Sequence, residues 1–429
     1  MNGPPSTSPT CPVSHEFDPF GAEFQADPGM SLVGAREHQP VFYSPRLDAY
    51  VVTRYHDIRS VFLDTTTFSP RNATVPITPL SAAAQAKLDE YEFRPVKTLG
   101  VEEEPVHMRL RKRLTDPFTP ARLEQFEPRI RSIWKEYVDA IVTRGRSDLI
   151  AEVTTDAPAV VALEFLGVPQ EDIAKTKDFA KGIMQFIFGR PTEDEQIRTC
   201  DFMGQHQRYS TELVQRLIES PEGEGFLRHC VRAFLDDPTD LDINYLSGLA
   251  MNGLAAAHET TSNAAGQALL QLLTHLDIWA ELCDEPALIP GAVEETLRIA
   301  PSGATWRRQA RVDTSIADVE VPAGATVLLV LASGNCDPEM FPEPARFDVR
   351  RDNARRHLTF GIGAHRCLGA GLAQLQLKVM LEQLSSRLPH MRLVDAQPVE
   401  RLGTASVGGP LHLEVEWDPA ENPLAEDRP

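Results

Sequence analysis

The chain has 429 residues, of which 42% are hydrophobic and 24% are charged, proportions that are typical of a globular protein. Its formal net charge of −20 argues against nucleic acids and anionic membrane surfaces as partners. No segment reaches the ~18 consecutive apolar residues of a membrane span, and no apolar signal segment follows the first methionine, so we expect a soluble, cytoplasmic protein.

The chain shows neither an internal repeat nor a low-complexity linker, which predicts one domain over residues 17–417. Residues 1–16 are polar and rich in proline, and the acidic residues 418–429 contain three prolines, so both end segments are expected to be flexible. The six cysteines are scattered without a C-x-x-C pair, which argues against a disulfide framework, a zinc site and an iron–sulfur cluster.

Two short segments, Val41–Tyr43 and Tyr50–Thr53, alternate in a way that predicts a β-hairpin. A basic helix is predicted further along, where His107 and Arg111 lie about one turn apart. Three more cations on this helix are typical of a solvated face or of a docking surface for an acidic partner: Arg109, Lys112 and Arg113.

Hydrophobic periodicity predicts mostly helix from Leu123 to about Gly253, and a second helical run over Ile243–Leu273. In the first region, one stripe of side chains recurs at helical spacing and is expected to face the core: Ile130, Ile133, Trp134, Tyr137, Val138 and Ile141.

The second run contains Ala256-Ala257-His258-Glu259-Thr260-Thr261, which is poorly placed for helix stability. Burying Glu259 without a partner would be unfavourable, and the Thr260 hydroxyl can bond back to the carbonyl four residues earlier and distort the turn. An isolated Glu-Thr-Thr is common on helix surfaces, so this run gains meaning only from its context.

Glu295 and Arg298 lie three residues apart on a predicted helix, a spacing that is common in surface ion pairs. Strand signals follow at Val312–Val321 and Thr326–Val330, separated by a turn at residues 322–324. Two arginines flank these strands: Arg308 and Arg346.

The most informative segment is Phe360-Gly361-Ile362-Gly363-Ala364-His365-Arg366-Cys367-Leu368-Gly369. Apolar residues recur after it at spacings of three and four, so a helix is expected to start directly after the sulfur. A thiol at a helix N-terminus meets the positive end of the dipole and free N–H groups, which favours the thiolate. The glycines let the backbone approach a flat molecule closely, as an axial haem-iron ligand requires. The alternative is a small buried cysteine before a helix.

This segment resembles the cysteine loop of the cytochrome P450 family, whose pattern is F-G-x-G-x-(H/R)-x-C-x-G. The resemblance implies a mainly α fold with small β-sheets, the P450 prism, and haem b (iron protoporphyrin IX) as cofactor. It further implies that Cys367 is the metal ligand, that His365 contacts a haem propionate and that Phe360 packs beside the thiolate. Six residues match the pattern: Phe360, Gly361, Gly363, His365, Cys367 and Gly369.

The Glu259 run resembles the family's central-helix motif (A/G)-G-x-(E/D)-T-(T/S), in which the helix crosses the distal face of the haem. The resemblance implies that Thr260 hydrogen-bonds the bound dioxygen, that Glu259 relays protons, and that Ala256 lies at the cofactor. Ala257 departs from the usual glycine, and its methyl group narrows the oxygen groove slightly. His258 is expected to face away from the haem.

The remaining positions follow the family's order along the chain. The resemblance implies that His107, Arg111 and Arg308 bind haem propionates, anions that a buried site must pair with cations. It also implies a structural network that locks the segment carrying the cysteine loop: Glu295, Arg298 and Arg346.

The resemblance implies a haem-thiolate monooxygenase that inserts one oxygen atom of O2 into a small apolar or aromatic substrate, by hydroxylation or oxidative O- or N-dealkylation. Segments at 11–15, 17–21 and 41–45 look like a branch whose haem domain is fused to a phthalate-dioxygenase-type reductase with FMN and a 2Fe–2S ferredoxin. No flavin motif or cysteine cluster follows here, so NAD(P)H electrons are expected through a separate reductase or ferredoxin. The alternative is a gas or redox sensor, which would not need the acid–threonine pair; a peroxide-driven enzyme typically replaces that pair.

The substrate pocket is expected to be compact and apolar. Its lining is predicted from residues 77–93, 184–187, 254–256, 302–306 and 405–407. Trp306 and Phe186 hint at aromatic ligands, although each could equally belong to the core. Five positions are the candidate pocket residues: Leu254, Ala255, Ala256, Ser302 and Trp306.

Overall fold

The computed structural model describes residues 16–179, 182–395 and 397–421. The sequence predicts flexible ends at residues 1–16 and 418–429. Of these, residues 1–15 and 422–429 lie outside the described residues.

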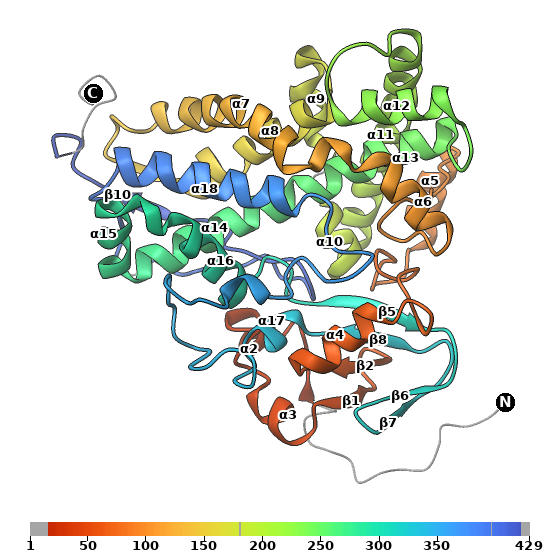
Figure 1. The fold of residues 1–429 in the computed structure, drawn as a ribbon, viewed down its shortest axis with the longest axis horizontal. Coiled ribbons are helices and arrows are strands. Elements are labelled where there is room, and N and C mark those ends of the chain that lie inside the picture. Colours follow the sequence, from red (N-terminus) through yellow and green to blue (C-terminus); the bar gives the residue numbers. More distant parts are fainter. Residues whose placement is uncertain (1–15, 180–181, 396, 422–429) are drawn as a thin grey trace.

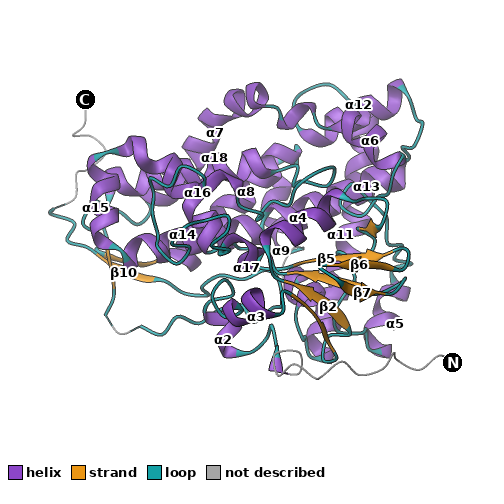
Figure 2. Cartoon of the chain, turned by 60° about the horizontal axis from the view of Figure 1, so that its bottom comes forward, coloured by secondary structure: helices purple, strands orange, loops and turns teal. Residues whose placement is uncertain are grey.

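Helices make up most of the described chain and the strands gather in small sheets beside them, which confirms the mainly α fold (Figures 1 and 2). Two long helices, α7 and α18, run along one side of the helical layer (Figure 1). The helices are α2 Ala22–Ala26, α3 Val33–His38, α4 Tyr55–Leu63, α5 Ala82–Glu90, α6 Val106–Leu114, α7 Pro120–Asp139, α8 Asp156–Leu166, α9 Ile173–Asp178, α10 Ile183–Phe188, α11 Glu193–Glu219, α12 Phe226–Asp236, α13 Ile243–Ala257, α14 Glu259–Thr274, α15 Leu276–Asp284, α16 Ile289–Ile299, α17 Leu331–Asn335 and α18 Ala370–Arg387.

The largest sheet joins segments from both ends of the chain. Its strand order is β1-β2-β8-β5-β3, and a second sheet has the order β4-β10-β9. The predicted hairpin is confirmed as β1 and β2, with Val41 opposite Val52, and β2 pairs in parallel with β8. The strands are β1 Val41–Ser44, β2 Ala49–Val52, β3 Phe68–Ser69, β4 Arg146–Asp148, β5 Trp306–Ala310, β6 Thr314–Ile316, β7 Val319–Val321, β8 Thr326–Leu329, β9 Arg392–Leu393 and β10 Glu414–Glu416.

Two strand predictions need correction. The single strand expected at Val312–Val321 is a hairpin of β6 and β7, because Ala317 and Asp318 both adopt positive φ and turn the chain. Strand β5 was not predicted, since its arginines and glutamine do not alternate with apolar residues. Its pairing with β8 nevertheless places it inside the main sheet.

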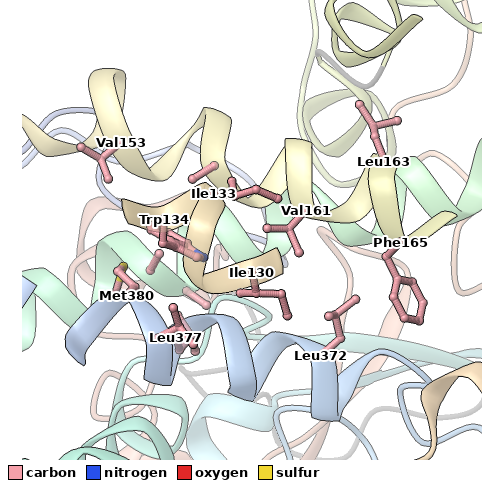
Figure 3. Packing of buried hydrophobic residues seen from close by; sticks show 14 of the residues in the cluster. Ile130, Ile133, Trp134, Val153, Val161, Leu163, Phe165, Leu372, Leu377 and Met380 are labelled. Carbon is pink, nitrogen blue, oxygen red and sulfur yellow. The ribbon is translucent and has the colours of Figure 1, made fainter. Parts of the chain in front are cut away.

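The main hydrophobic core lies between α7, α8 and α18 (Figure 3). The predicted stripe on α7 is confirmed, because Ile130, Ile133 and Trp134 are at most 1% exposed. They pack with residues of α18 such as Leu377 and Met380 (Figure 3). Each fully buried side chain of this size stabilises the fold by roughly 1.5–3 kcal/mol. Because α18 follows the cysteine loop directly, this packing fixes the far end of that loop.

The second predicted helix is broken. It forms α13 and α14, which meet at His258, whose φ of −83° and ψ of −80° interrupt the regular turn. The Thr260 hydroxyl donates to the Ala256 carbonyl at 2.6 Å, which confirms the predicted bond to the carbonyl four residues earlier. The Thr260 hydroxyl thus gives the Ala256 carbonyl a hydrogen-bond donor at the point where the helix is distorted.

Candidate functional site

The cysteine loop is a tight turn closed by its own backbone. The Cys367 N–H donates to the Phe360 carbonyl at 2.8 Å. Gly361 and Gly363 have φ of +63° and +78°, which side chains rarely adopt. A Cβ on Gly363 would also lie 3.1 Å from the Leu63 side chain at the end of α4. The two glycines therefore allow this loop to form against α4.

The Cys367 sulfur accepts hydrogen bonds from the main-chain N–H groups of Gly369 and Ala370, at the start of α18. The helix begins at Ala370, two residues later than predicted. Burial raises the pKa of the thiol, and the two amides, Arg366 and Arg111 oppose this effect without outweighing it. The helix start and the cations therefore act in the predicted direction, towards the thiolate, and burial acts against them. A thiolate becomes favourable here when a metal cation contacts the sulfur.

The Cys367 side chain has accessible surface although protein atoms surround it densely. The sulfur therefore faces a space inside the protein, beside the start of α18. Ala256, near the end of α13, is also exposed although Leu254 and His258 beside it are buried.

Two histidines from distant segments stack beside this loop. The rings of His107 and His365 lie 3.8 Å apart with an interplanar angle of 23°. Burial, together with His107 and Arg308, lowers the pKa of His365 to about 3. His107 Nε2 and His365 Nδ1 are buried and have no hydrogen-bond partner among the described residues. An acidic ligand group would supply the missing partner.

Arg308 is a buried cation without a negatively charged partner among the described residues. Its side chain is 3% exposed, and its one described hydrogen bond is to the neighbouring Arg307 carbonyl at 2.9 Å. Burial lowers the pKa of Arg308 to about 10, and no described carboxylate forms an ion pair with it. Arg111, by contrast, donates to the Arg366 carbonyl and so holds the cysteine loop itself. Buried cations without an anion, next to an accessible thiol, fit the propionates and iron of haem.

The Glu295–Arg298 pair is confirmed as a buried structural element. Both side chains are fully buried, and two hydrogen bonds of 2.7 Å join them. Arg298 also donates to the Asn335 carbonyl at 2.9 Å. The predicted role of Arg346 needs correction. Its guanidinium is 63% exposed and pairs with Glu343, whereas only its main-chain carbonyl accepts from Arg298.

Arg351 takes the place that the sequence assigned to Arg346. Its guanidinium is 8% exposed and donates to Glu295 at 3.0 Å. The neighbouring acid, Glu294, was also missed. It accepts from Gln374 of α18 at 2.8 Å and lies 3.4 Å from His357, just before the cysteine loop. Both glutamates of α16 therefore contact the segment before the cysteine loop, and Glu294 also contacts α18 after it. The two consecutive glutamates in the sequence could have suggested this role.

Glu259 lies beside Thr260 but its carboxylate is held by a different helix. The main-chain N–H groups of Gly182 and Met184, at the start of α10, donate to its two oxygens at 3.2 Å. Burial raises the pKa of Glu259 to about 7, although these two hydrogen bonds act in the opposite direction. His258 points elsewhere, since its Nε2 lies 2.9 Å from the Thr155 carbonyl, in agreement with the predicted structural role.

Several of the predicted pocket residues gather in one small apolar cluster. Ala255 and Trp306 belong to it, and the Phe188 ring of α10 lies 5.7 Å from the Trp306 ring. The other members include Ile183, Met184, Ile187, Met203, Leu402 and Val407.

Other pocket predictions fall elsewhere. Leu254 packs in the main helical core, and Phe186 belongs to a cluster with residues of α5 and α11. Ser302 is buried, and its carbonyl accepts from Gly408 at 2.9 Å. Ala256 is exposed and is therefore available to a ligand. Leu254 is therefore corrected to a core residue, and for Phe186 the core alternative is the one that the structure supports.

Two of the three cations proposed for docking are already engaged. Arg109 pairs with Asp240 at 2.7 Å, and Arg113 donates to the carbonyls of Thr239 and Ala233. They hold the connection between α12 and α13, which leaves Lys112 as the exposed cation of this set with no ion pair to a described residue.

Known proteins resemble the chain along most of its length. A family model described as cytochrome P450 matches residues 48–391. Cytochrome P450 monooxygenase PikC of Streptomyces venezuelae is 35% identical over 393 residues, which cover 89% of this chain and 88% of that protein. The heme domain of a Tepidiphilus thermophilus P450 superimposes with a TM-score of 0.94 and 39% identity, covering 97% of this chain and 99% of that chain.

An intact type IV self-sufficient cytochrome P450 monooxygenase gives a TM-score of 0.96 with 43% identity. The match covers 98% of this chain but 55% of that longer chain. Among the described residues, no helix is long and apolar enough to span a membrane.

Proposed function

Because the chain belongs to the cytochrome P450 family, a family of haem monooxygenases, we propose that it inserts one oxygen atom of O2 into a small apolar or aromatic substrate, by hydroxylation or oxidative O- or N-dealkylation. The observation that carries this proposal is the break between α13 and α14, where an acid with a raised pKa adjoins a threonine hydroxyl. A protein that only senses a gas has no need for two proton-carrying groups at this point.

In this proposal Cys367 is the ligand of the haem iron, and His107, His365, Arg111 and Arg308 lie on the side of the propionates. Phe360 and Gly369 shape the loop through the backbone bonds described above. Haem, when bound, supplies the activation of O2, with a thiolate ligand that favours O–O cleavage. The rest of the chemistry that the chain must supply is the ordered delivery of protons.

Glu259 and Thr260 are the residues that can supply those protons. With a pKa of about 7, Glu259 holds a proton on its carboxyl in part of the molecules at neutral pH and can release it. The Thr260 hydroxyl donates to the Ala256 carbonyl, so its oxygen keeps a lone pair that can accept a proton as it gives up its own. Ala256, which is exposed beside them, leaves room for a ligand.

We further propose that NAD(P)H electrons arrive through a ferredoxin or through a reductase with FMN and a 2Fe–2S centre. The support is the likeness to the intact self-sufficient enzyme, of which the chain spans about half the length. The cytoplasm is the proposed location, because its reducing conditions keep Cys367 a free thiol.

The function is tested by turnover under 18O2 with a surrogate ferredoxin and ferredoxin reductase, and a panel of small aromatic compounds. The expected result is a product that carries one 18O atom, formed with consumption of NADPH. Tight haem binding together with NADPH oxidation but no oxygenated product from any compound would argue for a redox protein instead.

Replacing Thr260 by alanine is expected to lower the rate of product formation by about 10²-fold, because the hydroxyl that passes protons is lost. NADPH oxidation should continue, since electron delivery does not involve this side chain. The measurement is product formed per NADPH consumed. Thr260→Ser keeps the hydroxyl and should retain most of this ratio; equal loss in both variants would contradict the assigned role.

The raised pKa of Glu259 predicts a pH-dependent stability. The ordinary value is 4.5 and the folded value is about 7, so the stability due to this proton is complete below pH 4.5 and is lost as the pH rises through 7. Glu259→Gln lacks this loss. Between pH 5 and 8 the free energy of unfolding of the variant should therefore gain about 2–3 kcal/mol relative to the wild type.

Urea unfolding at a series of pH values measures this difference. Glu320→Gln, at an exposed position of β7, is the matched control and should follow the wild type at every pH. A constant difference between Glu259→Gln and the wild type would show that the Glu259 carboxyl does not titrate in this range.

A further inference from the structure

Arg307 of β5 is a buried cation whose hydrogen bonds are incomplete. Its side chain is 9% exposed, and its Nη2 donates to the main-chain carbonyls of Ala73 and Val75. Nε is buried without a partner, and Nη1 has no hydrogen bond to any described residue. A guanidinium carries five N–H donors, so most of its donor capacity is unused.

Arg307 also lacks a counter-ion, unlike Arg298 and Arg387, which are buried as ion pairs. Arg298 pairs with Glu295, and Arg387 pairs with Asp139. Arg36 is likewise buried without an ion pair, but its Nη1 donates to three oxygens of Gly29 and Ser333. No described carboxylate forms an ion pair with Arg307, and burial alone lowers its pKa to about 10. Its neighbour Arg308 shares this property, but the haem propionates account for Arg308. Nothing in the family's cofactor accounts for a second unpaired guanidinium on the adjacent position.

The position of Arg307 connects it to the candidate substrate pocket. Its guanidinium carbon lies 5.7 Å from the centre of the Phe188 ring, and that ring packs on Trp306 in the apolar pocket cluster. The carbonyls that it binds belong to the segment before Ile77, whose N–H donates to the Ile187 carbonyl of α10. Arg307 therefore lies beside the apolar cluster that contains Trp306, between α10 and the loop that follows β3.

We propose that the substrate carries a carboxylate on an otherwise apolar or aromatic body, and that Arg307 binds this carboxylate. This inference rests on the proposed monooxygenase function and narrows its substrate class. The free Nη1 group can donate a single charge-assisted hydrogen bond to one carboxylate oxygen, and such a bond is strongest where water is excluded. The aromatic rings of Phe188 and Trp306 suit the apolar body that the same substrate must have.

The test uses the haem-loaded protein and measures dissociation constants from the spin-state change of the haem absorbance. The probes are 4-ethyl-, 4-butyl- and 4-hexylbenzoate, each compared with the uncharged amide of the same shape. In the wild type, at least one benzoate should bind ten-fold or more tightly than its amide. Arg307→Gln should weaken benzoate binding ten- to one-hundred-fold and change amide binding less than three-fold. Arg307→Lys should recover part of the preference.

Arg311→Gln is the matched control, because Arg311 lies just after β5 and already pairs with Glu103 at 2.8 Å. It removes the same charge and should leave the benzoate preference unchanged. If the wild type binds no benzoate, or binds acids and amides alike, the proposal is overturned. Equal weakening of both probes in Arg307→Gln would assign Arg307 to holding the Ala73–Val75 loop and would also overturn it. The reduced, CO-bound spectrum of the wild type reports separately on the haem-thiolate function.

Discussion

Cys367→Ser is expected to abolish the strongly red-shifted Soret band of the reduced, CO-bound protein, together with all oxygenation. A serine hydroxyl stays protonated near neutral pH and cannot replace the electron-rich sulfur ligand. The backbone bonds that close the loop do not involve the side chain, so the fold should survive the change. The CO difference spectrum, recorded beside a haem stoichiometry, measures the effect.

The control for this experiment is Cys283→Ser, at a half-buried position of α15. It should keep the red-shifted band at full intensity. A red-shifted band in Cys367→Ser, or a His-type band in the wild type, would mean that Cys367 is not the ligand.

Glu295→Gln is expected to destabilise the fold by about 3–5 kcal/mol, because it leaves the Arg298 guanidinium buried without its charge partner. The same carboxylate accepts from Arg351 and from the Asp348 N–H, so three donors lose their acceptor charge. Thermal unfolding and the yield of haem-loaded protein measure the effect. Haem loading should fall as well, because these residues tie α16 to the segment that leads to the cysteine loop.

Arg346→Gln is the matched control, because that guanidinium is 63% exposed and pairs on the surface. Its effect should be about 0–1 kcal/mol. A loss as large as that of Glu295→Gln would restore Arg346 to the network and contradict the assignment of Arg351.

The sequence predicted those parts of the site that depend on local chemistry. The cysteine loop is recognisable because its glycines stand at fixed places in a short pattern, and Gly361 and Gly363 adopt a positive φ that glycine tolerates best. The bond from the Thr260 hydroxyl was also predictable, since it spans four residues of one helix. Features of this kind need no knowledge of how distant segments meet.

Features that depend on distant contacts were missed or misplaced. The sequence could not show that the start of α10 holds the Glu259 carboxylate, about 75 residues away along the chain. It likewise assigned to Arg346 a place that tertiary packing gives to Arg351. The strand β5 was not predicted, because three consecutive polar residues, Arg307 to Gln309, interrupt the alternation of apolar and polar residues that marks an ordinary strand.

Because β2 pairs with β8, the main sheet cannot form until most of the chain has been synthesised. The hairpin of β1 and β2 emerges early, but its parallel neighbour follows about 280 residues later. At a translation rate of roughly 5–20 residues per second, the open edge of β2 waits roughly 14–55 s for its partner. During this interval the edge can pair with another nascent chain. Slowing the ribosome between codons 100 and 320 should therefore increase aggregation, whereas slowing it over the last codons, after 400, should not.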